Sequence, residues 1–132
     1  MRWIVYLLAQ SRQQFNDSTN QQFNKFMTAE TFKSLALSFP GTEEKPHFDR
    51  TAFKVIKKRT FATLHEPSQS ANIVLTPMEQ SEFCEIEPNR IYPVANKWGA
   101  KGWTTFDLEY VSSEVVQAAL ELAYEAIFKK KK

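Results

Sequence analysis

The sequence predicts an α+β two-layer domain, with an antiparallel five-stranded sheet, helices packed on one face, and the order α-βββ-α-ββ-α. Two observations support this fold class. Apolar residues recur every three to four positions in three segments, and every second position in the short segments between them. The connections between the alternating segments are of hairpin length, which favours antiparallel pairing. With 132 residues, 42% of them hydrophobic, the chain can bury the core of one domain.

The first helix is predicted to begin after the N-cap Thr28 and to end at Pro40-Gly41. Its buried face carries four residues with helical spacing: Phe32, Leu35, Ala36 and Phe39. The following segment, "TEEKPHFDR" (42–50), shows no clear period. It is therefore predicted to be a polar connector.

Three strands with a period of two are predicted next, in "TAFKVIK" (51–57), "RTFATLHE" (59–66) and "ANIVLT" (71–76). The basic run Lys57-Lys58-Arg59 forms the turn of the first hairpin. This run contains no glycine or asparagine, the residues that usually supply the positive φ of a tight turn. The turn type therefore stays open.

The second helix has a capping box, in which Thr76 is the N-cap, Pro77 the first helical residue and Glu79 the reciprocal partner, and it stops at Pro88. The fourth and fifth strands are predicted in "RIYPV" (90–94) and "GWTTFDLEY" (102–110). Ser112 or Ser113 caps the final helix, whose buried face carries Val116, Ala119, Leu120, Ala123 and Ile127.

The composition argues against the common classes of enzyme and cofactor site. There is one cysteine, Cys84, so an internal disulfide and a cysteine-based zinc site are excluded. With three glycines, the chain has no phosphate-cradling loop and no dinucleotide fingerprint. The two histidines, His47 and His65, do not form a helical metal-binding pair. We therefore expect no catalytic residue, cofactor or metal, and a reducing, cytoplasmic setting.

Residues 1–26 differ in character from the rest. A short apolar run after Arg2 is too short to cross a bilayer, and a Gln/Asn-rich segment follows it. Met27 then stands just before the first helix cap. The expected domain is 27–132, and residues 1–26 are predicted to be a disordered or non-native extension. No membrane association is expected.

Several segments together resemble the MmcQ/YjbR-like family. They are "MTAETFKSLALSFPGTEE", "PHFDRTAFKVIKKRTFATLHE" and "FCEIEPNRIYPVANKWGAKGWTTFDLEYVSSEVVQAALELAYEAI", which agree with the family in order and spacing over about residues 27–128. The resemblance implies a cytoplasmic bacterial α+β domain with a fold like that of CyaY and type III secretion chaperones. The family is often labelled as DNA-binding through a "double wing" motif, so the resemblance also implies DNA binding.

Two basic stretches are the candidate nucleic-acid-binding residues, since cations near aromatic rings suit phosphates and bases. The first comprises Arg50, Lys54, Lys57, Lys58 and Arg59, with no acidic residue between Arg50 and Leu64; the second comprises Arg90, Asn96, Lys97, Trp98, Lys101 and Trp103. The alternative is that the lysines protect sheet edges and the two tryptophans form a structural lid. Asn96 is expected to tie loop backbone together rather than to read a base.

The leading hypothesis is a small non-enzymatic domain that binds DNA through the basic hairpin and the Lys/Trp loop, with charge reversal at Lys57, Lys58 and Arg59 weakening the binding. The net charge of only +2 means that the position of the charges must carry this argument. Two alternatives stay open: a protein-interaction adaptor with a fold like that of the secretion chaperones, and a small-molecule-binding domain. A monomer or weak dimer is expected.

Overall fold

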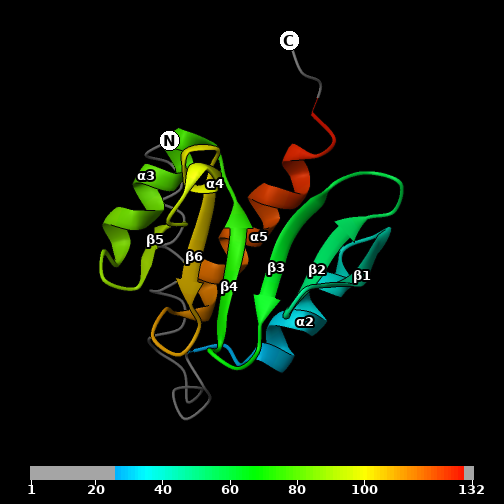
Figure 1. Cartoon of the computed structure of the whole chain (residues 1–132), viewed down its shortest axis with the longest axis horizontal. Helices are drawn as coiled ribbons and strands as arrows, with labels where there is room; N and C mark the ends of the chain where they lie inside the picture. Colours follow the sequence, from blue (N-terminus) through cyan, green and yellow to red (C-terminus); the bar gives the residue numbers. More distant parts are fainter. Residues whose placement is uncertain (1–25, 130–132) are drawn as a thin grey trace, which may run out of the picture.

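The computed structural model describes residues 26–129, which form one curved six-stranded sheet with helices (Figure 1). The elements in chain order are α2 (Ala29–Ser38), β1 (Thr42–His47), β2 (Arg50–Val55), β3 (Thr60–His65), β4 (Ser70–Val74), α3 (Pro77–Ile86), β5 (Ile91–Pro93), α4 (Lys97–Ala100), β6 (Trp103–Asp107) and α5 (Ser113–Ala126). The strands lie in the order β1-β2-β3-β4-β6-β5, and every neighbouring pair is antiparallel. The α+β class and the antiparallel sheet are confirmed.

The predicted strand number and element order are wrong, because the segment taken as a polar connector contains strand β1. This strand lies at the edge of the sheet and pairs only with β2. Glu43 and Glu44 form ion pairs with Lys54 (4.0 Å) and Lys33 (3.8 Å), on opposite faces of the strand. Because both faces carry charged side chains, β1 has no alternation of apolar and polar residues, and the backbone ladder alone defines it.

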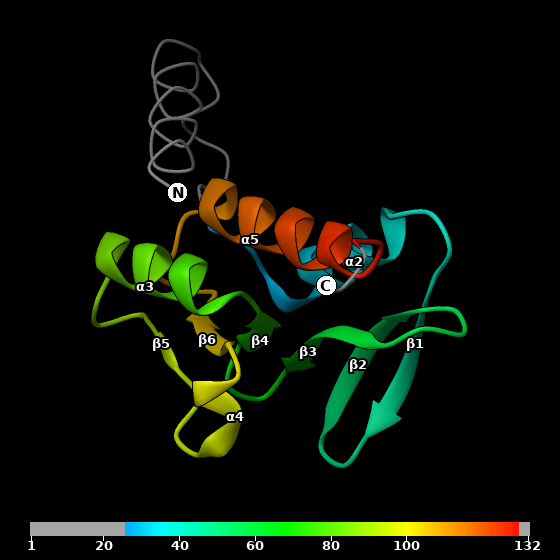
Figure 2. The same ribbon diagram turned by 90° about the horizontal axis from the view of Figure 1, so that it is seen from above.

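A second difference is α4, a single helical turn that the sequence pattern does not show. It is four residues long with Gly99 at its third position, too short for a helical period to appear. Figure 2 shows α2, α3 and α5 on one side of the sheet and α4 on the other. One side of the sheet is thus free of the three longer helices.

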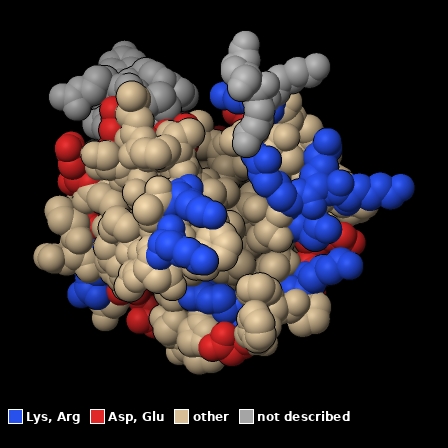
Figure 3. Space-filling model, turned by 45° about the horizontal axis from the view of Figure 1, so that its top comes forward, with Lys and Arg blue, Asp and Glu red and all other residues tan. Residues whose placement is uncertain are grey.

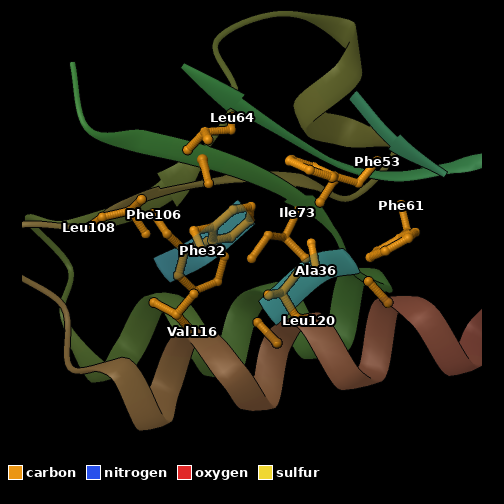
Figure 4. Packing of buried hydrophobic residues seen from close by; sticks show 14 of the residues in the cluster. Phe32, Ala36, Phe53, Phe61, Leu64, Ile73, Phe106, Leu108, Val116 and Leu120 are labelled. Carbon is orange, nitrogen blue, oxygen red and sulfur yellow. The ribbon is translucent and has the colours of Figure 1, made fainter. Parts of the chain in front are cut away.

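The core lies between the sheet and the helices α2 and α5 (Figure 4). Phe32 of α2 meets Phe53 of β2 edge to face, with ring centroids 5.9 Å apart, and Phe83 meets Phe106 in the same way at 6.0 Å. All four rings are fully buried. Such edge-to-face contacts add to the stabilisation from removing the rings from water.

The predicted helix starts are confirmed. Thr28 and Ser112 accept hydrogen bonds from the backbone N–H groups of Thr31 and Val115, and Thr76 with Glu79 forms a complete capping box. In the β2–β3 hairpin, Lys57 itself adopts the positive φ, at 65°. A lysine thus occupies a turn position where glycine or asparagine is usual.

The predicted extension lies almost wholly outside the described residues. Within residues 26–129, no helix is long and apolar enough to cross a membrane.

Candidate binding groove

The helix-free face of the sheet forms a groove with a volume of about 360 Å³. Its lining residues are His47, Arg50, Ala52, Thr60, Thr63, Asn72, Val94, Trp98 and Trp103. Residues opposite each other in a ladder share a face, so the strand pairing places Ala52, Thr63, Asn72 and Thr105 in one row across four strands. The Thr105 hydroxyl donates to Asn72 Oδ1 at 2.8 Å. The floor of the groove therefore carries polar side chains, one of them held by a hydrogen bond from the neighbouring strand, within a lining that is mostly apolar.

One wall of the groove is the turn of helix α4, which presents Trp98. The indole is 47% exposed, and the ammonium groups of Lys97 and Lys101 lie 5.9 and 5.1 Å from its ring centroid. Asn96 caps this turn, accepting a hydrogen bond from the Trp98 N–H at 2.9 Å. Its predicted role in tying the loop backbone is confirmed. The wall thus offers a half-exposed indole with two cations over its ring.

Gln80 of α3 fixes this wall to the body of the domain. Its Nε2 lies within hydrogen-bond distance of the carbonyls of Gly99 (3.1 Å) and Trp103 (3.2 Å) and of Thr104 Oγ1 (3.0 Å). At Gly99, an added Cβ would lie 2.0 Å from the carbonyl oxygen of Val94, so only glycine permits this approach. The loop that carries Trp98 is therefore held in place.

We expect Gln80→Leu to lower the free energy of unfolding by about 1–3 kcal/mol, since it removes the hydrogen bonds from Nε2 to the Gly99 and Trp103 carbonyls, which then keep only their backbone donors. Denaturant unfolding measures this loss. Gln117→Leu is the matched control, because Gln117 is exposed and bonds only to Glu121 at 3.3 Å on the surface of α5. An equal effect of the two substitutions would contradict the anchoring role of Gln80.

The other wall is the β1–β2 hairpin, which supplies His47 and Arg50. Arg50 Nη1 lies 3.4 Å from Thr63 Oγ1 on the floor. Partial burial lowers the pKa of the Arg50 guanidinium, and the nearby carboxylate of Asp49 opposes this shift. His65 Nε2 lies 3.1 Å from Asp49 Oδ2, and this contact ties the hairpin to β3. Arg50 is thus a partly desolvated cation at the side of the groove.

The structure separates the predicted basic residues. Arg50, Lys97 and Lys101 lie on or beside the groove, and Lys54 is on the same face in its ion pair with Glu43. Figure 3 shows a larger group of Lys and Arg side chains on the side of the β2–β3 hairpin, apart from a smaller group nearer the centre. The positive charge is therefore divided rather than continuous.

Three predicted residues contact other parts of the domain. Arg59 Nη2 lies 3.4 Å from the carbonyl oxygen of Ala126, and Lys58 Nζ lies 5.8 Å from the ring centroid of Phe128, both at the carboxyl end of α5. Cations at this position suit the negative end of a helix dipole. Arg90 stacks on Tyr110 at 3.7 Å and pairs with Asp107 at 3.0 Å. These side chains have structural partners besides any ligand.

The sequence pattern does not indicate Thr63 and Asn72 as groove residues, or Gln80 as the residue that holds the α4 wall. Thr63 and Asn72 gain their place only from strand register. Gln80 acts across the fold, on a loop about twenty residues away. Among residues 26–129, no group of three or more His, Cys, Asp or Glu side chains could hold a metal ion.

Comparison with known proteins gives the family. Among solved structures, the chain is similar to the crystal structure of Deinococcus radiodurans protein DR2400, which has a DUF419 domain, with a TM-score of 0.69 and 24% identity over 81% of this chain and 83% of that chain. That likeness supports the fold. No curated protein sequence matches the chain. Residues 37–126 match the model of the YjbR family. Because this match spans more than half of the sequence, the chain belongs to the YjbR family.

Proposed function

We propose that this domain binds DNA along the helix-free groove, between the α4 turn and the β1–β2 hairpin. The observation that carries the proposal is the combination of Trp98, Trp103 and Arg50 around one groove of about 360 Å³. A guanidinium and flanking ammonium groups attract phosphates, while open aromatic faces accept bases. This pairing of a cation with aromatic rings is typical of surfaces that bind nucleic acid strands.

Each side of the groove supplies a different part of the binding chemistry. Arg50 can form charge-assisted hydrogen bonds to a phosphate, and its partial burial makes such bonds stronger than they are in bulk water. Trp98 lies on the opposite wall with Lys97 and Lys101 beside it, so a base stacked on the indole would bring its phosphates toward two cations. Stacking on an aromatic ring contributes about 1–3 kcal/mol per base.

In this proposal, the β2–β3 hairpin acts mainly through its electrostatic field. Lys58 and Arg59 lie against the end of α5, but their charges still raise the local potential. Lys57, at the positive-φ position of the hairpin turn, is exposed, so its ammonium group can approach a phosphate. Charge reversal at these three residues should therefore weaken binding, and more at low salt than at high salt.

The test is fluorescence anisotropy with short labelled DNA across a salt series. Lys97→Gln and Lys101→Gln should each weaken binding and reduce the slope of log affinity against log salt by about 0.9 for duplex DNA, or about 0.7 for a single strand, the values for one lost phosphate contact. Lys33→Gln is the matched control, because Lys33 pairs with Glu44 on the helix-covered side of the sheet. It should change the affinity little.

Two results would remove the proposal. One is the absence of binding by the wild-type chain at low salt. The other is a loss of affinity that is equal for Lys33→Gln and for the two groove variants, which would mean that only net charge matters. The groove would then be assigned to a peptide or a small molecule.

A further inference from the structure

The turn of the β1–β2 hairpin presents an unusually open aromatic side chain. Phe48 is 94% exposed, the highest value among the exposed large hydrophobic residues of the described chain. It stands in a two-residue loop, with Asp49, between the paired residues His47 and Arg50. A single exposed aromatic residue is common, so exposure alone does not indicate a role.

The backbone at Phe48 adds a second observation. Its φ of 59° lies in the left-handed region, which costs an L-residue about 1–2 kcal/mol and which tight hairpins usually fill with glycine, asparagine or aspartate. Phenylalanine therefore gives the turn neither buried surface nor a favourable backbone. Strain of this kind is concentrated at functional sites.

The residues next to Phe48 hold its hairpin in place through contacts with β3. Asp49 pairs with His65 at 3.1 Å, and Arg50 approaches Thr63 at 3.4 Å, so both contacts hold the turn to β3. The ring of His47 meets that of Phe48 edge to face at 4.9 Å. These contacts present the Phe48 ring to solvent at a defined position.

That position is the mouth of the groove. His47 and Arg50, the neighbours of the turn, both line the groove. Figure 2 shows the β1–β2 turn and α4 projecting from the sheet on the same side, away from the three longer helices. Phe48 thus lies beside one wall of the groove, next to two of its lining residues, while Trp98 belongs to the other wall.

We propose that Phe48 stacks on an unpaired base, so that the groove selects single-stranded DNA over duplex DNA. This inference rests on the proposed function. The faces of bases in a duplex are covered by their neighbours, and inserting a ring between them costs a few kcal/mol of unstacking, whereas a single strand offers these faces freely. The residues beside Phe48 are His47, Asp49 and Arg50, which do not form the apolar patch that a hydrophobic protein partner would require.

The experiment compares single-stranded and duplex DNA of one sequence, using anisotropy for affinity and a 2-aminopurine base in the single strand to report stacking. Phe48→Ala should weaken single-strand binding about tenfold, as expected for the loss of one stacked base, and duplex binding by less than twofold. Phe48→Tyr should retain both affinities and the quenching of 2-aminopurine. Phe128→Ala is the matched control, because Phe128 is another exposed aromatic residue, at 51% against 94% for Phe48, but it contacts Tyr124 of α5 in the helix layer.

The outcomes separate the two proposals. If the wild-type chain binds neither form of DNA, the proposed function and this inference both fail. If Lys97→Gln and Lys101→Gln weaken binding but Phe48→Ala binds both forms as the wild type does, DNA binding stands and the role of Phe48 is overturned. An equal loss for single strand and duplex would overturn the selectivity. Phe48→Gly, which relieves the strained φ, should reproduce the binding loss without loss of stability, so unfolding cannot account for it.

Discussion

Gly102→Ala is expected to lower the free energy of unfolding by about 3 kcal/mol or more, the upper part of the range for single substitutions. An added Cβ would lie 1.8 Å from the carbonyl oxygen of Leu75, and Gly102 has a φ of +107°, which L side chains rarely adopt. The Leu75 N–H also donates to the Gly102 carbonyl at 2.9 Å. Because the contact is with backbone, the clash can be relieved only by separating the end of β4 from the start of β6.

Denaturant unfolding of Gly102→Ala and Gly41→Ala tests this expectation. Gly41 also has a positive φ, +75°, but an added Cβ would meet nothing within 4 Å. Gly41→Ala should therefore show only the cost of the left-handed conformation, about 1–2 kcal/mol. Equal losses for the two variants would mean that the approach of Leu75 to Gly102 is unimportant for stability.

Phe53→Ala should lower the free energy of unfolding by about 3–5 kcal/mol, the usual cost of removing a buried aromatic ring. Phe53 is fully buried and packs edge to face on Phe32. Its removal leaves a cavity between β2 and α2, and β2 also carries Ala52 and Arg50 on the groove side. The variant should therefore lose both stability and the defined shape of one groove wall.

Phe53→Leu is the control, since it keeps most of the apolar volume and should cost much less than the alanine variant. Thermal and denaturant unfolding measure both changes. If Phe53→Ala costs less than 1 kcal/mol, the contact with Phe32 does not hold the hairpin to the helix layer. Phe48→Ala on the same hairpin should leave stability nearly unchanged, because Phe48 buries almost no surface.

The predictable parts of the fold were those in which local signals and burial agree. The capping box at Thr76 and the apolar face of α5 require only short-range chemistry, so the sequence alone indicates them. Strand β1 carries charges on both faces and is stabilised by backbone pairing with a neighbour, a contact that no local pattern encodes. The single turn of α4 is shorter than one helical period.

The candidate site was predictable to the extent that its residues lie close in the sequence. Asn96, Lys97, Trp98 and Lys101 occupy one loop, and the sequence identified that loop as a unit. The groove itself depends on strand register, because Arg50, Thr63 and Asn72 come from three strands. Phe48 gives no signal in the sequence, since its importance comes from its exposure and its φ.

Because the β1–β2 hairpin lies at the edge of the sheet, the residues of its turn can be varied without changing the core. Residues 47–50 lie at the tip of the outermost hairpin, and none of them belongs to the buried core. Exchange of Phe48 or His47 should therefore alter ligand choice at little expense in folding, whereas exchange of the α4 wall disturbs Gly99 and Gln80. A library of variants confined to residues 47 and 48 would therefore sample new ligand recognition while Asp49 and Arg50 keep their contacts with β3.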